Sequence, residues 1–299
     1  MQEKVVVQLS QQLEKQDIDR IEWMRNLPFL GVHFCCVFVL WTDITWVAFW
    51  VGLVALLVRM FGLTAGYHRY FCHRSFKTSR TFQFVLAWLG AAAAQRGPLW
   101  WAGHHRLHHR HADTDADVHP PGVKGFFWAH AGWLMSARNE PTRVEWVPDF
   151  AKFRELRWLD SNHYVAPVSL GVALYVLGEW LAQTSPTLGT NGWQMLVVGL
   201  FLSTTILYHV TFAVNSLGHQ VGKRRYDTND DSRNSFWLAV LTAGEGWHNN
   251  HHRYPTSERQ GFYWWEVDIT HYGVVLLSWF RIVWDIRGPS LAVLSEGAW

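Results

Sequence analysis

The placement of basic residues between long apolar stretches is the feature that most constrains this chain. Four apolar stretches, at about residues 27–41, 44–63, 164–181 and 193–214, are candidate membrane spans. Of the 26 Lys and Arg residues, all but Arg59 precede the first stretch, lie between residues 65 and 160, or follow residue 215. Cytoplasmic segments of membrane proteins are enriched in Lys and Arg. The partition therefore predicts four spans, with both termini and both long polar segments in the cytoplasm.

The remaining composition agrees with an integral membrane protein. Charged residues make up 17% of the chain and there are 20 Trp, a residue enriched at membrane interfaces. The first stretch is short for a bilayer core, which needs about 20 apolar residues. A soluble helical protein with buried helices is the alternative, and the charge partition disfavours it. Three cysteines exclude a disulfide framework, and a net charge of +2 does not indicate nucleic-acid binding.

The polar segments at the two ends define the expected domain organisation. Residues 1–26 are polar and charged, which is unlike a secretory signal peptide. We interpret them as an N-terminal cytosolic segment and residues 285–299 as a C-terminal tail. A single domain is expected over residues 27–284.

Most of the 17 histidines fall in four short motifs, all on the predicted cytoplasmic side. The motifs are HRYFCH at 68–73, HRLHH at 105–109, NSLGH at 215–219 and HNNHH at 248–252, which follows Glu-Gly-Trp. Helix positions i, i+3 and i+4 share one face, so two triplets should each converge. These triplets are His105, His108 and His109, and His248, His251 and His252. His68 and His73 are five residues apart and need a helix end or a local distortion to reach one point.

Converging imidazole groups favour a metal centre. Imidazole is a common neutral ligand of Zn, Cu, Fe and Ni. Nine converging histidines exceed the four ligands that satisfy a structural zinc ion, so two ions are expected to share the set. A solvated basic surface is the alternative for each motif taken singly. Five further histidines look isolated, and we interpret them as structural or interfacial: His33, His130, His163, His209 and His271.

The four motifs resemble the histidine boxes of the membrane fatty acyl desaturases, with the stearoyl-CoA (C9) branch as the nearest. The resemblance covers about residues 63–268. It implies an all-α integral membrane protein, with four transmembrane helices and a cytosolic helical cap that holds a dimetal site. It also implies two irons. The first would be bound by His68, His73, His105, His109 and His251, and the second by His108, His219, His248 and His252, with Asn215 acting through water.

The same resemblance assigns residues around the metals and along the acyl chain. Acidic residues beside the boxes, namely Asp113, Asp117 and Glu245, could orient histidine ligands through hydrogen bonds. The acidic run between residues 113 and 117 could equally be a solvated loop. Gln95, Trp101 and Phe212 fall at positions that line the acyl tunnel, although the acyl-CoA enzymes usually have Trp where Phe212 stands.

The implied activity is O2-dependent insertion of a cis double bond, at C9, into a saturated acyl chain. An unactivated C–H bond has no acidic proton, so its oxidation requires an oxidant derived from O2. The described motifs include no haem-binding module and no Fe–S cysteine pattern, which implies a separate electron donor, a ferredoxin or a cytochrome b5. Acyl-CoA is slightly preferred over acyl-lipid as substrate. Against CoA, Gly103-His104 replaces the Arg-Asp pair of the animal acyl-CoA enzymes, and Arg138-Asn139 stands where two basic residues are common.

Two other function classes remain open. A related di-iron hydroxylase or decarboxylase acting on an alkyl chain would share the histidine boxes and the spans. A metal transporter or sensor would need polar groups near the middle of its spans, where this sequence has almost none. Product analysis would separate the first pair of activities, and metal uptake into vesicles would identify the transporter.

Overall fold

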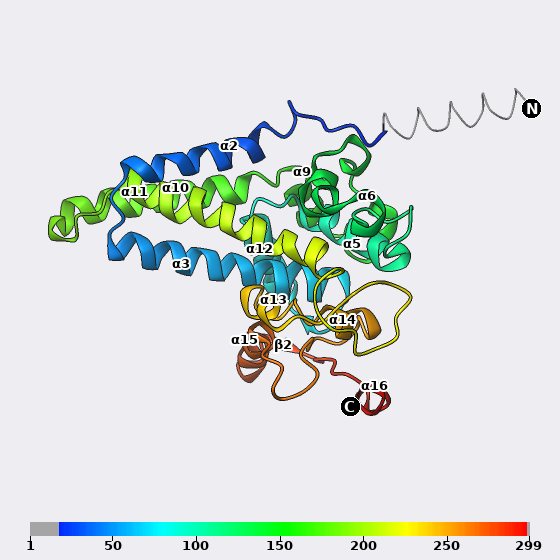
Figure 1. Cartoon of the computed structure of the whole chain (residues 1–299). Helices are drawn as coiled ribbons and strands as arrows, with labels where there is room; N and C mark the ends of the chain where they lie inside the picture. The colour runs from blue at the N-terminus through cyan, green and yellow to red at the C-terminus, as the bar shows by residue number, and fades with distance from the viewer. Residues whose placement is uncertain (1–17, 298–299) are drawn as a thin grey trace, which may run out of the picture.

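The computed structural model describes residues 18–297, so most of the predicted N-terminal segment lies outside the described residues. Long apolar helices lie side by side at one end of the molecule, and shorter helices gather at the other end (Figure 1). The long elements are α2 (Leu27–Cys35) with η1 (Cys36–Trp41), α3 (Trp46–Phe61) with η2 (Gly62–Cys72), α10 (Val165–Thr184), and α11 (Gly192–Leu196) with η7 (Val197–Leu202) and α12 (Ser203–Leu217).

Three of these helical segments are long and apolar enough to cross a membrane. They are Trp46–Cys72, Val165–Thr184 and Gly192–Leu217, with mean hydropathies of 2.0, 1.6 and 1.8. The segment Leu27–Trp41 is apolar but shorter. Its nine α-helical and six 3-10 residues extend about 25 Å, below the roughly 30 Å of a hydrocarbon core. Of the four predicted spans, three are confirmed as candidates, and the first stays a prediction.

The short elements form the rest of the molecule, which we call the cap. They are β1 (Lys77–Thr78), α4 (Arg80–Ala91), α5 (Pro98–His111), α6 (Pro121–Lys124), η3 (Trp128–Gly132), α7 (Trp133–Met135), η4 (Ala137–Asn139), η5 (Val144–Trp146), α8 (Pro148–Ala151), α9 (Arg154–Ser161), α13 (Phe236–Leu241), α14 (His248–Arg253), α15 (Ile269–Trp279), β2 (Val283–Trp284) and α16 (Leu291–Glu296). A further 3-10 turn, η6 (Pro186–Leu188), connects α10 to α11. The strands β1 and β2 pair antiparallel, which ties the chain after η2 to the chain after α15.

The second predicted span, residues 44–63, is longer in the structure than the sequence indicated. Apolar composition ends near Leu63, but the helix continues to Cys72 as a π-helical segment. Gly62 and Gly66 allow this segment to contact α4 closely. A Cβ on Gly62 would lie 2.5 Å from the backbone of Leu89, and one on Gly66 would lie 3.0 Å from the carbonyl oxygen of Leu86. Small residues four apart commonly let helices approach in membranes.

A buried arginine links α3 to α12. Arg59 is 1% exposed, and its guanidinium donates hydrogen bonds to the hydroxyl groups of Thr204 and Ser203 at 2.6 and 2.5 Å. It also donates to the carbonyl oxygen of Ala55 at 2.9 Å. Charged groups in membrane helices face the interior and require such partners. The link fixes α3 against α12, and the chain continues from each of these helices into a histidine motif.

The helix that carries HRLHH is fixed at its first turn. Pro98 occupies the start of α5, and the carboxylate of Asp160 accepts hydrogen bonds from the backbone amides of Leu99 and Trp100, both at 2.9 Å. A carboxylate at a helix N-terminus satisfies free amides and interacts favourably with the helix dipole. Asp160 lies near the end of α9, so the two helices are fixed relative to each other.

Replacing Gly62 with Ala should destabilise the protein, because the new methyl group would overlap the backbone of α4. Overpacking typically costs about 1–3 kcal/mol. Gly31→Ala is the matched control, since a Cβ there meets nothing within 4 Å. Thermal unfolding in detergent should show a lower melting temperature for Gly62→Ala and an unchanged melting temperature for Gly31→Ala. Equal stability of the two variants would contradict close packing of η2 against α4.

Candidate metal centre

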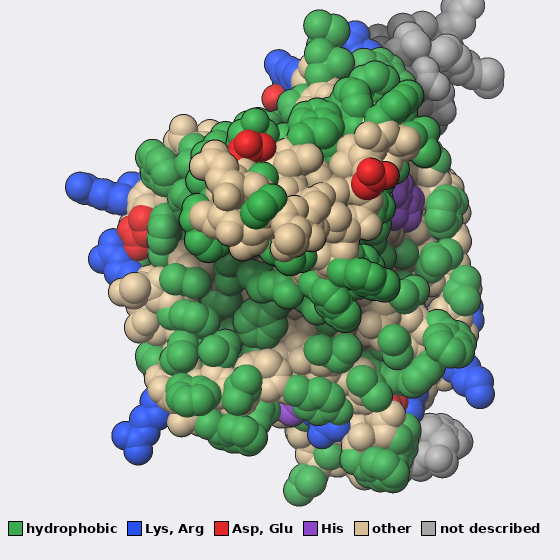
Figure 2. All heavy atoms as spheres, turned by 90° about the vertical axis from the view of Figure 1, so that its left-hand side faces the viewer, with side chains coloured by type: hydrophobic (Ala, Val, Ile, Leu, Met, Phe, Trp, Pro, Cys, Tyr) green, Lys and Arg blue, Asp and Glu red, His purple; other side chains and the backbone are tan. Residues whose placement is uncertain are grey.

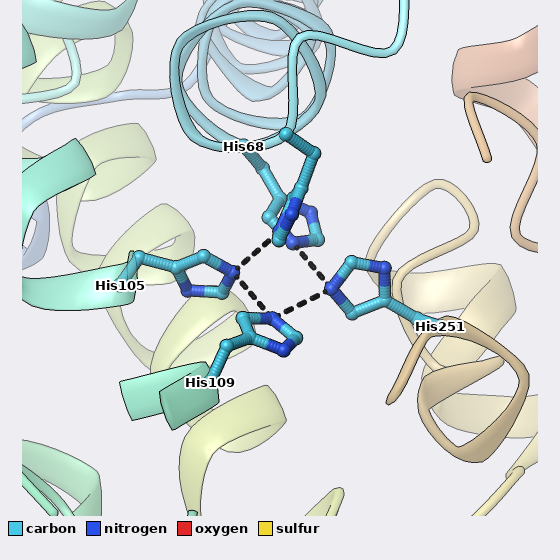
Figure 3. Close-up of side chains that lie close together, drawn as sticks. His68, His105, His109 and His251 are labelled. Atoms are coloured by element: carbon cyan, nitrogen blue, oxygen red, sulfur yellow. Dashed lines mark hydrogen bonds between the residues drawn. The ribbon is translucent and has the colours of Figure 1, made fainter. Parts of the chain in front are cut away.

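Nine histidines from the four motifs converge in the interior of the cap, in two groups. The first group is His68, His73, His105, His109 and His251, and the second is His108, His219, His248 and His252. Within each group, one ring nitrogen per residue lies within 4.8 Å of the others. In Figure 3, the labelled rings of His68, His105, His109 and His251, from η2, α5 and α14, are directed at a common centre.

The spacing of His68 and His73 is accommodated as the sequence required. The π-helical turn gives a hydrogen bond from the backbone amide of His73 to the carbonyl oxygen of His68, at 3.3 Å. The helix ends directly before His73. The two ring centroids are then 4.9 Å apart. The five-residue spacing is therefore reconciled by both a helix end and a local distortion.

Contacts between nitrogens in the first group exceed what hydrogen bonds can satisfy. The Nε2 atom of His109 lies 2.9 Å from Nε2 of His105 and 2.9 Å from Nε2 of His251. His105 Nε2 is also 2.9 Å from His73 Nε2, and His251 Nε2 is 3.0 Å from His68 Nε2. An imidazole nitrogen offers either one hydrogen or one lone pair. Three such nitrogens with two nitrogen neighbours each suit lone pairs directed at a shared cation.

The second group is similar but has fewer internal contacts. His219 and His248 approach each other with their Nε2 atoms 3.0 Å apart. The Nε2 atoms of His108 and His252 are buried and have no hydrogen-bond partner. A buried unpaired nitrogen is costly unless something binds it. Both groups therefore fit a metal ion, and all nine ligand atoms are nitrogens.

Carboxylates face the outer nitrogens of four of these rings, and three of these carboxylates were singled out in the sequence. His219 Nδ1 lies 2.7 Å from Asp113, and His108 Nδ1 lies 2.9 Å from Asp117. His68 Nδ1 contacts Glu245. Each Nδ1–H can donate to its carboxylate, which leaves Nε2 unprotonated and directed inward. The three acidic residues singled out in the sequence thus lie beside histidines, and their effect on bound metal is part of the proposal below.

Sequence reasoning missed three residues of this outer layer. Asp230 accepts from His252 Nδ1 at 2.8 Å, and Gln260 lies 3.1 Å from His68 Nδ1. Arg69, 1% exposed, donates to Glu245 at 3.0 Å and to Asp268 at 2.9 Å. Asp230 and Gln260 come from loops, where sequence gives no periodic signal. Arg69 directly follows His68, and that position is the one available clue.

Burial controls the charge of the centre. Desolvation lowers the pKa of His73, His105 and His109 well below the usual histidine range. It has the same effect on the pKa of the histidines of α14. Burial alone would raise the pKa of Glu245, but the charges of His68 and Arg69 lower it to about 2. These six rings are therefore neutral, as metal ligation requires, and the Glu245 carboxylate is anionic.

Two small cavities, of about 50 and 40 Å³, border the histidines. A third cavity, of about 230 Å³, lies between α2, α10 and α12, and we call it the α2/α10/α12 cavity. Gln95 lines all three, and its amide donates to Thr211 at 2.7 Å. Trp101 lines both small cavities and stacks on His105, with centroids 5.0 Å apart. Phe212 lines the α2/α10/α12 cavity and one small one.

Asn215 lies beside both small cavities. It follows the apolar part of α12 and lines these cavities together with His105. Its action on a metal through water stays a prediction.

Three of the five histidines that we interpreted as structural or interfacial form a hydrogen-bonded chain. His33 Nε2 lies 3.2 Å from His209 Nε2, and His209 Nδ1 lies 3.0 Å from His130 Nε2. His130 Nδ1 in turn lies 3.0 Å from the hydroxyl group of Ser216. Here each nitrogen has one polar neighbour, so a neutral hydrogen-bonded chain satisfies them all. The chain joins α2, α12 and η3, which no local sequence pattern could reveal.

Replacing Asp230 with Asn should weaken metal binding at the second group. Loss of a carboxylate behind a histidine ligand typically costs about 10–100-fold in metal affinity. Asp227→Asn is the matched control, because that side chain is fully solvent-exposed in the same loop. The metal content of each variant would be measured after dialysis against a graded chelator series. Retention equal to that of Asp227→Asn would show that Asp230 does not support a ligand.

Known proteins match the chain over most of its length. The family model for fatty acid desaturases covers residues 44–275. The sn-1 stearoyl-lipid 9-desaturase of Anabaena variabilis is 38% identical over 275 residues, which are 90% of this chain and 94% of that protein. The sn-2 palmitoyl-lipid 9-desaturase of a Nostoc strain is 35% identical, over 89% of this chain and 90% of that protein. An acyl-CoA 5-desaturase of Anemone leveillei is 36% identical, over 87% and 78%. The chain therefore belongs to the fatty acid desaturase family, as its histidine motifs predicted.

Proposed function

We propose that this protein is an acyl desaturase that inserts a cis double bond at C9 of a saturated acyl chain, using O2 and two non-haem irons. The observation that carries the proposal is the pair of histidine groups beside a chain of apolar cavities. Membership of the desaturase family supports the reaction class. The position C9 rests on the 9-desaturases among its relatives.

The residues fit two irons by their chemistry and number. Five nitrogens in one group and four in the other, with Asn215 through water, would hold them. When bound, the iron pair supplies the O2-dependent oxidation that removes hydrogen from an unactivated C–H bond. Nitrogen ligation without thiolate suits iron better than a soft-metal site. The buried carboxylates Asp113, Asp117 and Glu245 keep three rings oriented and balance part of the added charge.

The protein's own contribution is to place the chain and exclude water. An acyl chain in the α2/α10/α12 cavity would pass Phe212 and Gln95 to reach the histidines. Trp101, which stacks on His105, would fix the chain at the point closest to the first histidine group. Removing two hydrogens while reducing O2 to two waters also consumes two protons and two electrons. The electrons require a separate donor, and a ferredoxin or a cytochrome b5 carries them in our proposal.

The surroundings of the cavity support a membrane lipid as the carrier of the acyl chain. The α2/α10/α12 cavity is lined by Pro28 and Val32 of α2, Val168 of α10, and Phe201, so it lies along the apolar helices. Val168 is 61% exposed on the surface that would face lipid. An acyl chain could therefore enter sideways from the bilayer.

The positions compared with the CoA-binding pair add to this preference. His104 is fully buried between Trp100 and Trp133, and Gly103 abuts Arg143. Asn139 is 1% exposed. These positions cannot contact a CoA phosphate without rearrangement. The slight preference for acyl-CoA drawn from the sequence is accordingly replaced by a preference for acyl-lipid.

We further propose that Leu27–Trp41 spans the membrane in addition to the three candidate helices, which makes four spans. Both termini and the metal centre would then lie in the cytoplasm. Support comes from the partition of Lys and Arg and from the position of eight of the nine grouped histidines outside the three candidate membrane helices. This organisation makes residues 27–284 one functional domain. It also disfavours a transporter, whose metal site would lie within the spans.

Replacing His251 with Ala should abolish desaturation while leaving the protein inserted in the membrane. The change removes a nitrogen that contacts two other rings, but it alters no apolar span. His111→Ala is the control, since His111 belongs to neither histidine group. Fatty acids from cells expressing each variant would be analysed for double-bond position. A C9 cis-monoene with His251→Ala would refute the site. A hydroxylated or shortened product from the wild type would favour the hydroxylase or decarboxylase alternative.

The carrier can be decided with purified protein in nanodiscs. Deuterated stearate would be presented either within the membrane phospholipid or as stearoyl-CoA, with the same reduced ferredoxin. We expect deuterated oleate in the phospholipid and little or none in CoA, because the cavity opens along the apolar helices. Desaturation of stearoyl-CoA alone would overturn the preference for lipid, while leaving the desaturase reaction itself intact.

A further inference from the structure

The helices α13 and α15 of the cap expose an apolar face that no described residue covers. On α15 this face consists of Ile269, Tyr272, Leu276, Trp279 and the following Phe280, each between 49% and 74% exposed. On α13 it consists of Phe236, Trp237, Val240 and Leu241, between 39% and 74% exposed. A contiguous apolar patch of this size on a folded protein marks an interaction surface.

The spacing shows that α15 is apolar on two opposite faces. Thr270 and Val274 point inward and are buried, and Gly273 packs so closely on Phe61 that a Cβ would lie 2.7 Å from its ring. The exposed set follows at intervals of three and four residues, which is one face of an α-helix. The inner face thus contacts α3, and the outer face points away from the protein.

The two helices lie together. The backbone amide of Thr270, in the first turn of α15, donates to the carbonyl oxygen of Ala243, just after α13, at 2.9 Å. Figure 1 places α13 and α15 as neighbours below α3. Their exposed side chains therefore contribute to one surface, which we call the α13/α15 face.

The contact with Phe61 fixes the depth of this surface. Fifteen residues of α-helix separate Trp46 from Phe61, which is about 23 Å along the axis. His68 lies farther along the same axis, in the π-helical segment η2. A hydrocarbon core is about 30 Å thick. With Trp46 at the far boundary, Phe61 lies within the near edge of the core and His68 lies closer to the cap.

Apolar side chains are also exposed on α3, close to the residue that α15 contacts. Val54, Leu57 and Val58 of α3 are 43–57% exposed, and Leu57 lies one turn from Phe61. Figure 2 views the molecule along the long helices from their far end, and hydrophobic side chains cover much of this view below these helices as well. Most Lys and Arg side chains in that view extend from its edges.

We propose that the α13/α15 face is seated in the membrane, at the boundary between the hydrocarbon core and the headgroups of the leaflet next to the cap. Trp237 and Trp279 have the amphipathic rings that favour this boundary. A helix of this kind lies in the plane of the interface with its apolar face buried about 5–10 Å. The cap is then held to the bilayer on two sides, by the spans and by this face, and the metal centre is fixed at a set height above the hydrocarbon core.

Site-specific quenching would test the location. Leu276→Cys would be labelled with an environment-sensitive fluorophore in the full-length protein, after replacing Cys35 and Cys36 with Ala. The remaining Cys72 is buried. The labelled protein would be reconstituted in phosphatidylcholine vesicles containing lipids with a nitroxide near the top of the acyl chain. Leu57→Cys on α3 serves as the lipid-exposed control and Asp227→Cys as the water-exposed control.

We expect the Leu276 label to be quenched by the lipid nitroxide to the same degree as the Leu57 label, and by aqueous iodide at least several-fold less than the Asp227 label. Quenching by iodide equal to that at Asp227 would overturn the proposal, because the face would then lie in water. Protection from both quenchers that is lost on dilution of protein in lipid would also overturn it, and would assign the face to a second copy of the chain. None of these readouts depends on desaturase activity.

Discussion

The convergence of imidazole nitrogens in a dry interior is the constraint on which this structure depends. Three Nε2 atoms in the first group each have two nitrogen neighbours at about 3 Å, although each can form only one hydrogen bond. Such an arrangement is unfavourable by itself and becomes favourable around a cation. The chain formed by His33, His209 and His130 shows the contrast, because there every nitrogen has a single partner. The difference between the two arrangements separates a metal centre from a hydrogen-bonded link.

The rest of the fold serves to hold these nitrogens. The glycines of η2 bring the first motif against α4, and Asp160 fixes the start of the helix that carries the second. Arg59 holds α12 against α3, and NSLGH follows directly from α12. Arg69 then connects the back of the first motif to carboxylates from the last third of the chain. The links through Asp160, Arg59 and Arg69 are polar, so loss of one partner would leave the other unsatisfied.

The sequence predicted much of the site because its signals are local. Positions i, i+3 and i+4 in α5 and α14 bring six histidines to the centre, but each expected triplet divides between the two groups. His105 and His109 join the first group and His108 the second, whereas His251 joins the first and His248 and His252 the second. The spacing of His68 and His73 indicated the distortion that the π-helix provides. The end of the second span was misplaced, because apolar composition stops at Leu63 whereas helical hydrogen bonding continues. Asp230 and Gln260 were missed because loop residues acquire neighbours only through tertiary folding. The chain of three histidines was missed for the same reason.

In our proposal, a common geometry also relates the acyl chain to the membrane. The α2/α10/α12 cavity lies along the apolar helices, and Gln95 and Phe212 line both this cavity and a small cavity beside the histidines. An acyl chain that entered from the bilayer would follow this path from the helices to the cap. The α13/α15 face would keep the cap at the height at which this path and the metal centre meet. Substrate access and cap placement are in this sense parts of one arrangement.

The most direct test of the account is to locate iron in the protein itself. Protein produced in iron-supplied cells would be crystallised in lipid, and anomalous scattering would be recorded on both sides of the iron absorption edge. The account predicts two iron peaks per chain, one within the group containing His105 and His251 and one within the group containing His219 and His248. A single peak, or peaks outside these two groups, would contradict it.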